Sequence, residues 1–217
     1  MNSSARGMRV LVTAGAAGIG KAFAETFADA GAKVFVCDVD QAALDAFHAA
    51  RPAIGACIAD VADPKQVDAL FDAATPFLDG LDVLINNAGI SVPTAPVENI
   101  DIGDWNRTIA VDLNGMFYCT RLAVPLLKAA GGGSIVNLSS VAGRLGYPLR
   151  TPYSAAKWAV VGFTKSLAME LGPANIRVNA IQPGIVEGER IERVISAKAK
   201  ALGVSFDQYK AQLLSKV

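Results

Sequence analysis

Two residue types that build many enzyme sites are scarce in this chain of 217 residues. Its one histidine, His48, gives no support for a Ser-His-Asp triad and is expected on the exposed face of a helix. No cluster of Cys, His and Asp has the spacing of a metal site, so no bound metal is expected. The three cysteines, Cys37, Cys57 and Cys119, are far apart and set among apolar residues. They are predicted to be reduced core thiols rather than disulfide partners.

Long apolar runs and an excess of one charge are also missing. No run reaches the ~18 apolar residues of a membrane helix, and the first residues lack the apolar stretch of a signal peptide. Twenty Lys and Arg residues balance twenty Asp and Glu residues, without a basic run. Neither nucleic acid nor a membrane surface is therefore an expected partner. We expect a cytoplasmic protein that binds a small molecule.

What the chain has in abundance is apolar sequence in short runs. With 52% hydrophobic and 18% charged residues, and no linker or repeat, one domain is expected over residues 1–217. Continuous runs of Val, Ile and Leu are typical of strands that are covered on both faces in a parallel sheet. The expected strands are Arg9–Thr13, Lys33–Cys37, Ala56–Ile58, Val83–Asn86, Ser134–Leu138 and Arg177–Ile181. The expected helices between them are Gly18–Ala30, Gln41–Ala50, Pro64–Leu78, Asp104–Ala130 and Tyr153–Leu171. This alternation predicts an α/β fold: a single doubly wound parallel sheet (Rossmann fold) with helices on both faces.

A glycine-rich turn, Thr13–Gly20, follows the first strand and opens the first helix. Glycines let the backbone approach a pyrophosphate closely, and the free amides at a helix start face its negative charge. The cofactor-binding candidates in this turn are Gly15, Ala17, Gly18, Ile19 and Gly20. We expect a dinucleotide to bind here.

Two acidic positions at strand ends bear on which dinucleotide binds. Asp38 closes the second strand eighteen residues after Gly20, where a carboxylate can accept hydrogen bonds from adenosine ribose hydroxyls and repel a 2′-phosphate. No basic side chain stands at Ala17 or after Asp38, so NAD is predicted over NADP. Asp60 and Val61 end the third strand and are candidates for contact with adenine, although an ordinary turn would explain them nearly as well.

Tyr153 and Lys157 lie four residues apart in a helical pattern, so a phenol and an ammonium share one helix face. A nearby cation favours the phenolate form of a tyrosine and suits it to acid/base chemistry near neutral pH. Ser140 lies thirteen residues before Tyr153. The pair by itself is a weak signal, and it gains weight from the glycine turn.

From about Val10 to Gly184 the chain resembles the short-chain dehydrogenase/reductase family. The motifs that carry the resemblance, in the family's order, are Thr13–Gly20, Asn86-Asn87-Ala88-Gly89, Asn114, Ser140, Tyr153 with Lys157, and Pro183-Gly184. The resemblance implies that Tyr153 is the general acid/base and that Lys157 favours its phenolate and binds the nicotinamide ribose. Ser140 would hydrogen-bond the substrate oxygen, which leaves Ser139 as a structural hydroxyl.

The resemblance also implies roles for residues outside that triad. Asn114 would bend its helix and hold a water that leads protons from Lys157 to solvent. Asn87, Ala88 and Gly89 would lie along the cofactor, with Asn87 tying neighbouring strands together. The nicotinamide would pack against Pro183, Gly184 and Ile185.

The C-terminal part departs from the family pattern. A threonine that commonly follows Pro183-Gly184 is replaced by Ile185-Val186-Glu187-Gly188, so one cofactor contact is expected to be lost. Residues 185–217 contain two helical patterns, Glu189–Leu202 and Ser205–Leu214, and are expected to form a substrate lid. The family's usual last helix and seventh strand have no counterpart, and the native protein is expected to be longer. Arg144 and Arg150, in the loop before Tyr153, could meet an acidic substrate, but solvated arginines are the favoured interpretation.

The expected function is NAD(H)-dependent interconversion of a secondary alcohol and a ketone, with Asn114, Ser140, Tyr153 and Lys157 as the catalytic set. One alternative is reduction of a 3-oxoacyl thioester, and another is a catalytically idle NAD-binding scaffold. The apolar helix stripes in Asp104–Ala130 and Tyr153–Leu171 are expected to lie in the core or at contacts of a homodimer or homotetramer.

Overall fold

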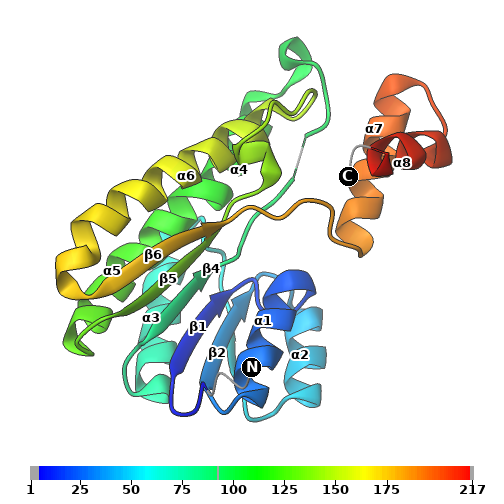
Figure 1. Ribbon diagram of the computed structural model, residues 1–217. Coiled ribbons are helices and arrows are strands. Elements are labelled where there is room, and N and C mark those ends of the chain that lie inside the picture. Colours follow the sequence, from blue (N-terminus) through cyan, green and yellow to red (C-terminus); the bar gives the residue numbers. More distant parts are fainter. Residues whose placement is uncertain (1–4, 92, 216–217) are drawn as a thin grey trace.

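One parallel sheet organises the computed structural model, which describes residues 5–91 and 93–215 (Figure 1). Its strand order is β3-β2-β1-β4-β5-β6, and every neighbouring pair is parallel. The strands are β1 (Arg9–Thr13), β2 (Lys33–Asp38), β3 (Gly55–Ile58), β4 (Val83–Asn86), β5 (Gly133–Leu138) and β6 (Ile176–Ile181). The order reverses direction between β1 and β4, which is the switch point of a doubly wound sheet and the place where such sheets bind ligands. The predicted fold class is confirmed.

The apolar runs become strands because both faces of the sheet are covered by side chains. Leu11 belongs to one core cluster, whereas its neighbours Val10 and Val12 belong to the other. Successive side chains of a strand point to opposite faces, so a continuous apolar run supplies both cores. The central strands are thereby fixed in register.

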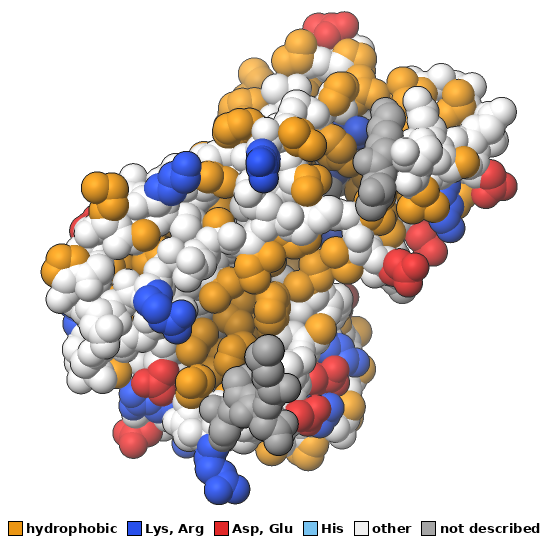
Figure 2. All heavy atoms as spheres, in the orientation of Figure 1, with side chains coloured by type: hydrophobic (Ala, Val, Ile, Leu, Met, Phe, Trp, Pro, Cys, Tyr) orange, Lys and Arg blue, Asp and Glu red, His pale blue; other side chains and the backbone are white. Residues whose placement is uncertain are grey.

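Helices cover the two faces unequally (Figure 1). On one face α1 (Gly18–Asp29) and α2 (Gln41–Ala50) pack against β1, β2 and β3. On the other face α3 (Pro64–Leu78), α5 (Gly115–Ala129) and α6 (Thr151–Leu171) pack along the whole sheet. Figure 2 shows hydrophobic side chains gathered on the sheet face that α1 and α2 leave open. Ile181 on β6 is 41% exposed there.

One predicted helix differs from the structure. The region predicted as Asp104–Ala130 consists of α4 (Ile102–Ile109), a π-helical segment η2 (Ala110–Asn114) and α5. A π-helical turn inserts one extra residue, so it rotates the side chains that follow relative to those before it, and such turns are frequent at functional sites. Uninterrupted helical periodicity gave no signal of this turn. The other predicted elements agree with the structure within two residues at their ends.

Short elements complete the chain. Three single turns of 3-10 helix were not predicted: η1 (Val97–Asn99), η3 (Val141–Gly143) and η4 (Gly172–Ala174). After β6 an extended segment leads to α7 (Glu189–Leu202) and α8 (Phe206–Leu214), which lie beside each other away from the sheet (Figure 1). Ser205 starts α8 with a capping box to Gln208. These two helices form the described part of the expected lid; residues 216–217 of that range, and residues 1–4 of the expected domain, lie outside the described residues.

Within the described ranges, no helix is long and apolar enough to cross a membrane. His48 is exposed, as predicted, on α2. All three cysteines are free. Burial raises the pKa of Cys119 to about 12, and burial also raises the pKa of Cys37. Cys37 and Cys119 are core residues, as predicted, whereas Cys57 is only partly buried.

Candidate functional site

Lys157 lies at the centre of the candidate site, one helical turn after Tyr153 on α6. Its ammonium is buried and donates to the carbonyl oxygen of Leu138 at 3.0 Å, at the end of β5. The same nitrogen lies 5.6 Å from the centroid of the Tyr153 ring. The helix face predicted from the four-residue spacing therefore brings the phenol and the ammonium together at the carboxyl edge of the sheet.

Asp112, which sequence reasoning gave no role, is the acidic partner of Lys157. Its carboxylate is fully buried, lies 3.3 Å from the Lys157 ammonium and accepts a 2.6 Å hydrogen bond from the Ile90 amide. Burial raises the pKa of the Asp112 carboxyl, and the charge of Lys157 partly offsets that effect. The side chain that contacts Lys157 is thus Asp112, two residues before the predicted Asn114. Asn114 is the last residue of η2 and is only partly buried.

The two candidate serines have different environments. Ser139 donates to the carbonyl oxygen of Lys157 at 2.8 Å and so ties β5 to α6. Ser140 begins η3, and its hydroxyl oxygen accepts from the Ala142 amide at 3.2 Å. Ala142 also accepts a hydrogen bond from Ser154, the neighbour of Tyr153, at 2.9 Å. Ser139 is therefore structural, as predicted, and Ser140 is held close to the start of α6.

The glycines of the turn have two roles: Gly15 and Gly20 allow close packing of the chain, and Gly18 borders open space. A Cβ on Gly20 would lie 2.1 Å from the Ala14 carbonyl oxygen, and one on Gly15 would lie 2.6 Å from Val36, so both positions need glycine for packing of the chain itself. Gly18 differs, with a φ of +52° and open space where a Cβ would be. Ala17 starts α1 without a side-chain cap, and no acidic residue stands in the first turn. The amides of this turn, including that of Ile19, are thus oriented as an anion site would need.

Asp38 lies beside that turn. Its carboxylate accepts from the Ala16 amide at 3.2 Å and from the Val39 amide at 2.8 Å, and Gly15 donates to the Cys37 carbonyl oxygen at 2.9 Å. The Asp38 carboxylate at the end of β2 is therefore held against the glycine turn, as the spacing predicted.

Both carboxylate oxygens of Asp60 have partners within the protein. One of its oxygens pairs with Arg107 of α4 at 2.8 Å, and the other accepts from the Ala62 amide at 2.9 Å. Val61 is buried, and a Cβ on Gly115 would lie 2.7 Å from it. The turn at Asp60 and Val61 is well explained by packing against α4 and α5, the alternative that the sequence had left open.

The segment after β4 is fastened to the glycine turn. Asn87 donates from its side chain to the carbonyl oxygens of Thr13 and Ala14, each at 3.0 Å, and the Ala88 amide donates to the Thr13 hydroxyl at 3.0 Å. The predicted tie between strands is confirmed. A Cβ on Gly89 would lie 3.1 Å from the Lys157 ammonium. Glycine at this position thus makes room for Lys157.

The segment after β6 passes over η3. The Val141 amide donates to the Pro183 carbonyl oxygen at 3.0 Å, and Val141 is also the nearest contact of a Cβ placed on Gly184, at 3.9 Å. Ile185 is half-buried. These three residues therefore lie on the same edge as Ser140 and Lys157.

Arg150 is buried, contrary to the expectation from the sequence. The favoured interpretation was a solvated arginine, but its side chain is 0% exposed, whereas Arg144 is exposed as expected. The Arg150 guanidinium lies 5.6 Å from the Tyr153 ring centroid and 6.0 Å from that of Tyr147. Its position at the start of α6 turns it inward toward the candidate site, which the loop sequence did not reveal.

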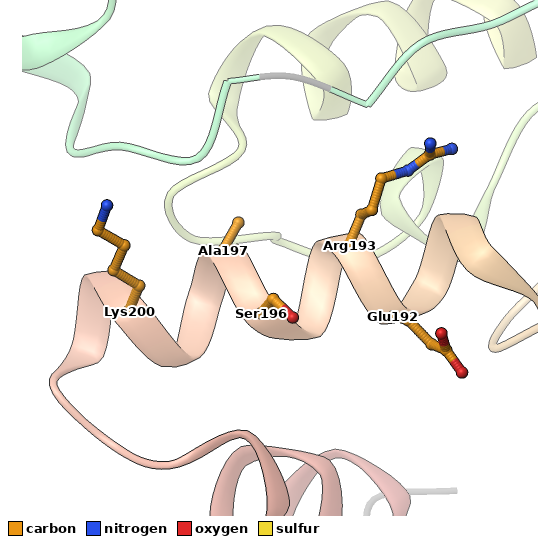
Figure 3. Close-up of a pocket in the computed structure, with 5 residues that line it drawn as sticks. All are labelled: Glu192, Arg193, Ser196, Ala197 and Lys200. Carbon is orange, nitrogen blue, oxygen red and sulfur yellow. The ribbon is translucent and has the colours of Figure 1, made fainter.

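A hollow of about 640 Å³ lies along α7 (Figure 3) and is lined by Glu192, Arg193, Ser196, Ala197 and Lys200. None of Ser140, Tyr153 and Lys157 lines it. Within the described residues no group of three or more His, Cys, Asp or Glu side chains could hold a metal ion. The candidate catalytic residues therefore lie outside this hollow.

The fold and the site define an oxidoreductase built on a doubly wound parallel sheet. The chain matches the short chain dehydrogenase family over residues 8–199 and belongs to that family. It acts on CH–OH groups, as the dehydrogenases of the family do.

Three relatives illustrate the match. The chain is 43% identical to trans-4-hydroxycyclohexanecarboxylate dehydrogenase of Sinomonas cyclohexanicum, over 82% of this chain and 71% of that protein. It is 38% identical to 2-dehydro-3-deoxy-L-rhamnonate dehydrogenase (NAD(+)) of a Sphingomonas species, over 87% and 76%. The crystal structure of NAD+-bound xylitol dehydrogenase superposes with a TM-score of 0.93 at 29% identity, covering 98% of this chain and 85% of that one.

Proposed function

We propose that the protein interconverts a secondary alcohol and a ketone with NAD(H), using Tyr153, Lys157 and Ser140. The observation that carries this proposal is the position of the buried Lys157 ammonium, 5.6 Å from the Tyr153 ring centroid. Ser140 lies close to the same helix start through Ala142 and Ser154. A phenol next to a buried cation, with a hydroxyl donor nearby, is suited to move a proton at a substrate oxygen.

The residues fit a dinucleotide. Open space at Gly18 and the uncapped start of α1 suit a pyrophosphate, and the carboxylate of Asp38 suits ribose hydroxyls. Asp38 would repel a 2′-phosphate, which favours NAD over NADP. Two of the relatives described above carry NAD in their names, and this supports the assignment.

In the direction of alcohol oxidation, NAD+ held by the turn at Gly18 and by Asp38 would supply the acceptor for the hydride that leaves the alcohol carbon. The Tyr153 phenolate takes the proton of the alcohol oxygen, so that a C=O bond forms as the C–H and O–H bonds break. Ser140 donates a hydrogen bond to the same oxygen. The buried Lys157 ammonium lies 5.6 Å from the centroid of the ring whose oxygen takes this proton. Asp112 orients Lys157 through the 3.3 Å ion pair, and Asn114 is kept as the residue proposed to hold the water by which the proton leaves.

Hydroxy acids are the first substrates to test, because two of the relatives act on compounds with a carboxylate by their names. We expect turnover of trans-4-hydroxycyclohexanecarboxylate with NAD+, and weaker or no turnover of the polyol xylitol.

The experiment begins with parallel titrations of the purified protein with NADH and NADPH, followed by nicotinamide fluorescence. NADH is expected to bind more tightly, and NAD+ to be reduced in the presence of the secondary alcohol. Tighter binding of NADPH with reduction of a 3-oxoacyl thioester would replace the proposal by that alternative. Binding of NADH without turnover of any alcohol or ketone tested would favour the idle scaffold.

Assembly through α5 and α6 is part of the proposal. Phe117, Trp158 and Met169 are exposed on these helices, at 48%, 52% and 84%. Large exposed apolar side chains on neighbouring helices are suited to contact with a second copy. Light scattering is expected to give the mass of a dimer or tetramer.

A further inference from the structure

Arg150 is a buried cation with unused donors. Its Nη2 donates to the carbonyl and hydroxyl oxygens of Ser91, whereas Nε and Nη1 are buried without a hydrogen-bond partner among the described residues. Buried polar atoms are nearly always paired, and an unpaired buried charge is costly. Nε and Nη1 therefore need a hydrogen-bond acceptor, and none of the described residues provides one.

The surroundings make this cation still more unfavourable. Arg150 immediately precedes α6, where the helix dipole already contributes positive potential. Burial lowers the pKa of its guanidinium, and the titratable groups that act on it are Tyr147, Tyr153, Tyr209 and Arg190. No carboxylate is among them. Stacking near two tyrosine rings offsets only part of the cost of burial.

A second cation approaches the same place from α7. Lys198 is buried, and its ammonium lies 3.8 Å from the centroid of the Tyr147 ring. The Arg150 guanidinium lies 6.0 Å from the centroid of the same ring. Two cations from separate elements thus meet around one tyrosine next to Tyr153. Such an arrangement is suited to an anionic group on a small molecule.

We propose that the substrate is a hydroxy acid whose carboxylate binds Arg150, with Lys198 contributing from α7, while its alcohol carbon lies at Tyr153. This inference rests on the proposed function and names its substrate class. The guanidinium and the Tyr153 ring are 5.6 Å apart, so the carboxylate and the hydroxyl belong to one small molecule. Nε and Nη1 are enclosed in this structure. Entry of the acid therefore requires the side chains that enclose these nitrogens to move aside.

The test compares 4-hydroxycyclohexanecarboxylate with its neutral carboxamide, which has the same shape without the charge. The wild-type kcat/KM for the acid is expected to exceed that for the amide by roughly 10- to 100-fold, as charge-assisted hydrogen bonds allow. Equal values, or a preference for the amide, would overturn the inference while leaving the dehydrogenase proposal intact.

Single substitutions test whether Arg150 causes the preference for the acid over the amide. In Arg150→Gln the preference for the acid is expected to fall to about threefold or less. Arg144→Gln, which removes the same charge from an exposed position of the same loop, should retain it. A preference that survives Arg150→Gln would assign Arg150 to stacking alone. Lys198→Met gives a second test if Arg150→Gln does not fold, and it should lower the preference several-fold.

Binding without turnover separates the two proposals. Cyclohexanecarboxylate and cyclohexanecarboxamide, which have no hydroxyl to oxidise, are titrated by calorimetry into protein saturated with NAD+. Preferential binding of the acid, lost in Arg150→Gln, would support the acid site even if no alcohol were oxidised. Equal binding of the two compounds, or binding of neither, would refute it whatever the turnover.

Discussion

The Asp112 carboxylate lies 3.3 Å from the Lys157 ammonium, and both side chains are buried. This pair joins the π-helical segment η2 to α6 and sets the position of the cation beside Tyr153. Because the carboxylate also accepts from the Ile90 amide, it connects both helices to the segment after β4. The negative charge of Asp112 therefore holds the Lys157 ammonium in place beside Tyr153.

Asp112→Asn should lower kcat/KM for alcohol oxidation. The amide keeps the acceptor for Ile90 but loses the negative charge that holds the Lys157 ammonium at 3.3 Å, so the cation is positioned less firmly beside Tyr153. Steady-state kinetics measure kcat/KM. Asp104→Asn, at an exposed position of α4, is the matched control. An unchanged kcat/KM in Asp112→Asn would show that Asp112 does not act through Lys157.

The stability of the same variants tests the buried pair. Asp112→Ala leaves Lys157 without its partner and should lower the free energy of unfolding by about 3 kcal/mol, whereas Asp112→Asn, which retains an acceptor, should cost less. Urea unfolding gives both values. Equal losses in the two variants would mean that the loss of the negative charge, which both variants share, determines the cost.

Tyr153→Phe should lower kcat by roughly 100- to 10,000-fold, the usual contribution of general acid/base catalysis. The substitution removes one oxygen and leaves the ring, so NADH binding should change little. Tyr118→Phe removes a hydroxyl from α5 and should keep normal turnover. Full activity of Tyr153→Phe would sink the proposed mechanism.

Asp38→Asn should weaken NADH binding by roughly tenfold and narrow the difference between NADH and NADPH, because the neutral amide neither accepts as strongly nor repels a 2′-phosphate. Dissociation constants for both nucleotides come from nicotinamide fluorescence. Asp45→Asn removes the same charge from an exposed position on α2. If the two variants had the same ratio of NADH to NADPH dissociation constants, residues other than Asp38 would determine the choice of cofactor.

Asp82 makes stability depend on pH through Arg9. Hydrogen bonds from the Arg9 side chain, at 2.9 and 2.8 Å, hold the pKa of the Asp82 carboxyl below its usual value. A carboxyl whose folded pKa is lowered contributes stability above its unfolded value near ~4 and loses it as the pH falls through the folded value.

Asp82→Asn should therefore lower the free energy of unfolding by about 1 kcal/mol near neutral pH, and this difference should shrink as the pH falls from about 4 toward 2. Urea unfolding of both proteins across that range measures it. Asp72→Asn, an exposed carboxylate on α3, should show no such trend. A difference that grew on acidification would contradict the assigned direction.

Local patterns determined most of the fold. The apolar runs of β1 and β4 predicted buried strands because each supplies side chains to both cores. The spacing of Tyr153 and Lys157 determined a shared helix face. These features depend on neighbours within a few residues, so the sequence alone shows them.

Tertiary structure decided which polar residue faces which. Asp112 and Asn114 are both polar residues of one predicted helix, and only the π-helical turn η2 and the position of α6 place Asp112 against Lys157. Arg144 and Arg150 belong to one loop, yet one is exposed and the other buried beside Tyr153. Periodicity within one element carries no information on the rotation of one helix against another or on the path of a loop. Those follow from packing between distant segments, which is why the sequence could identify the helix of the candidate site but not the groups around it.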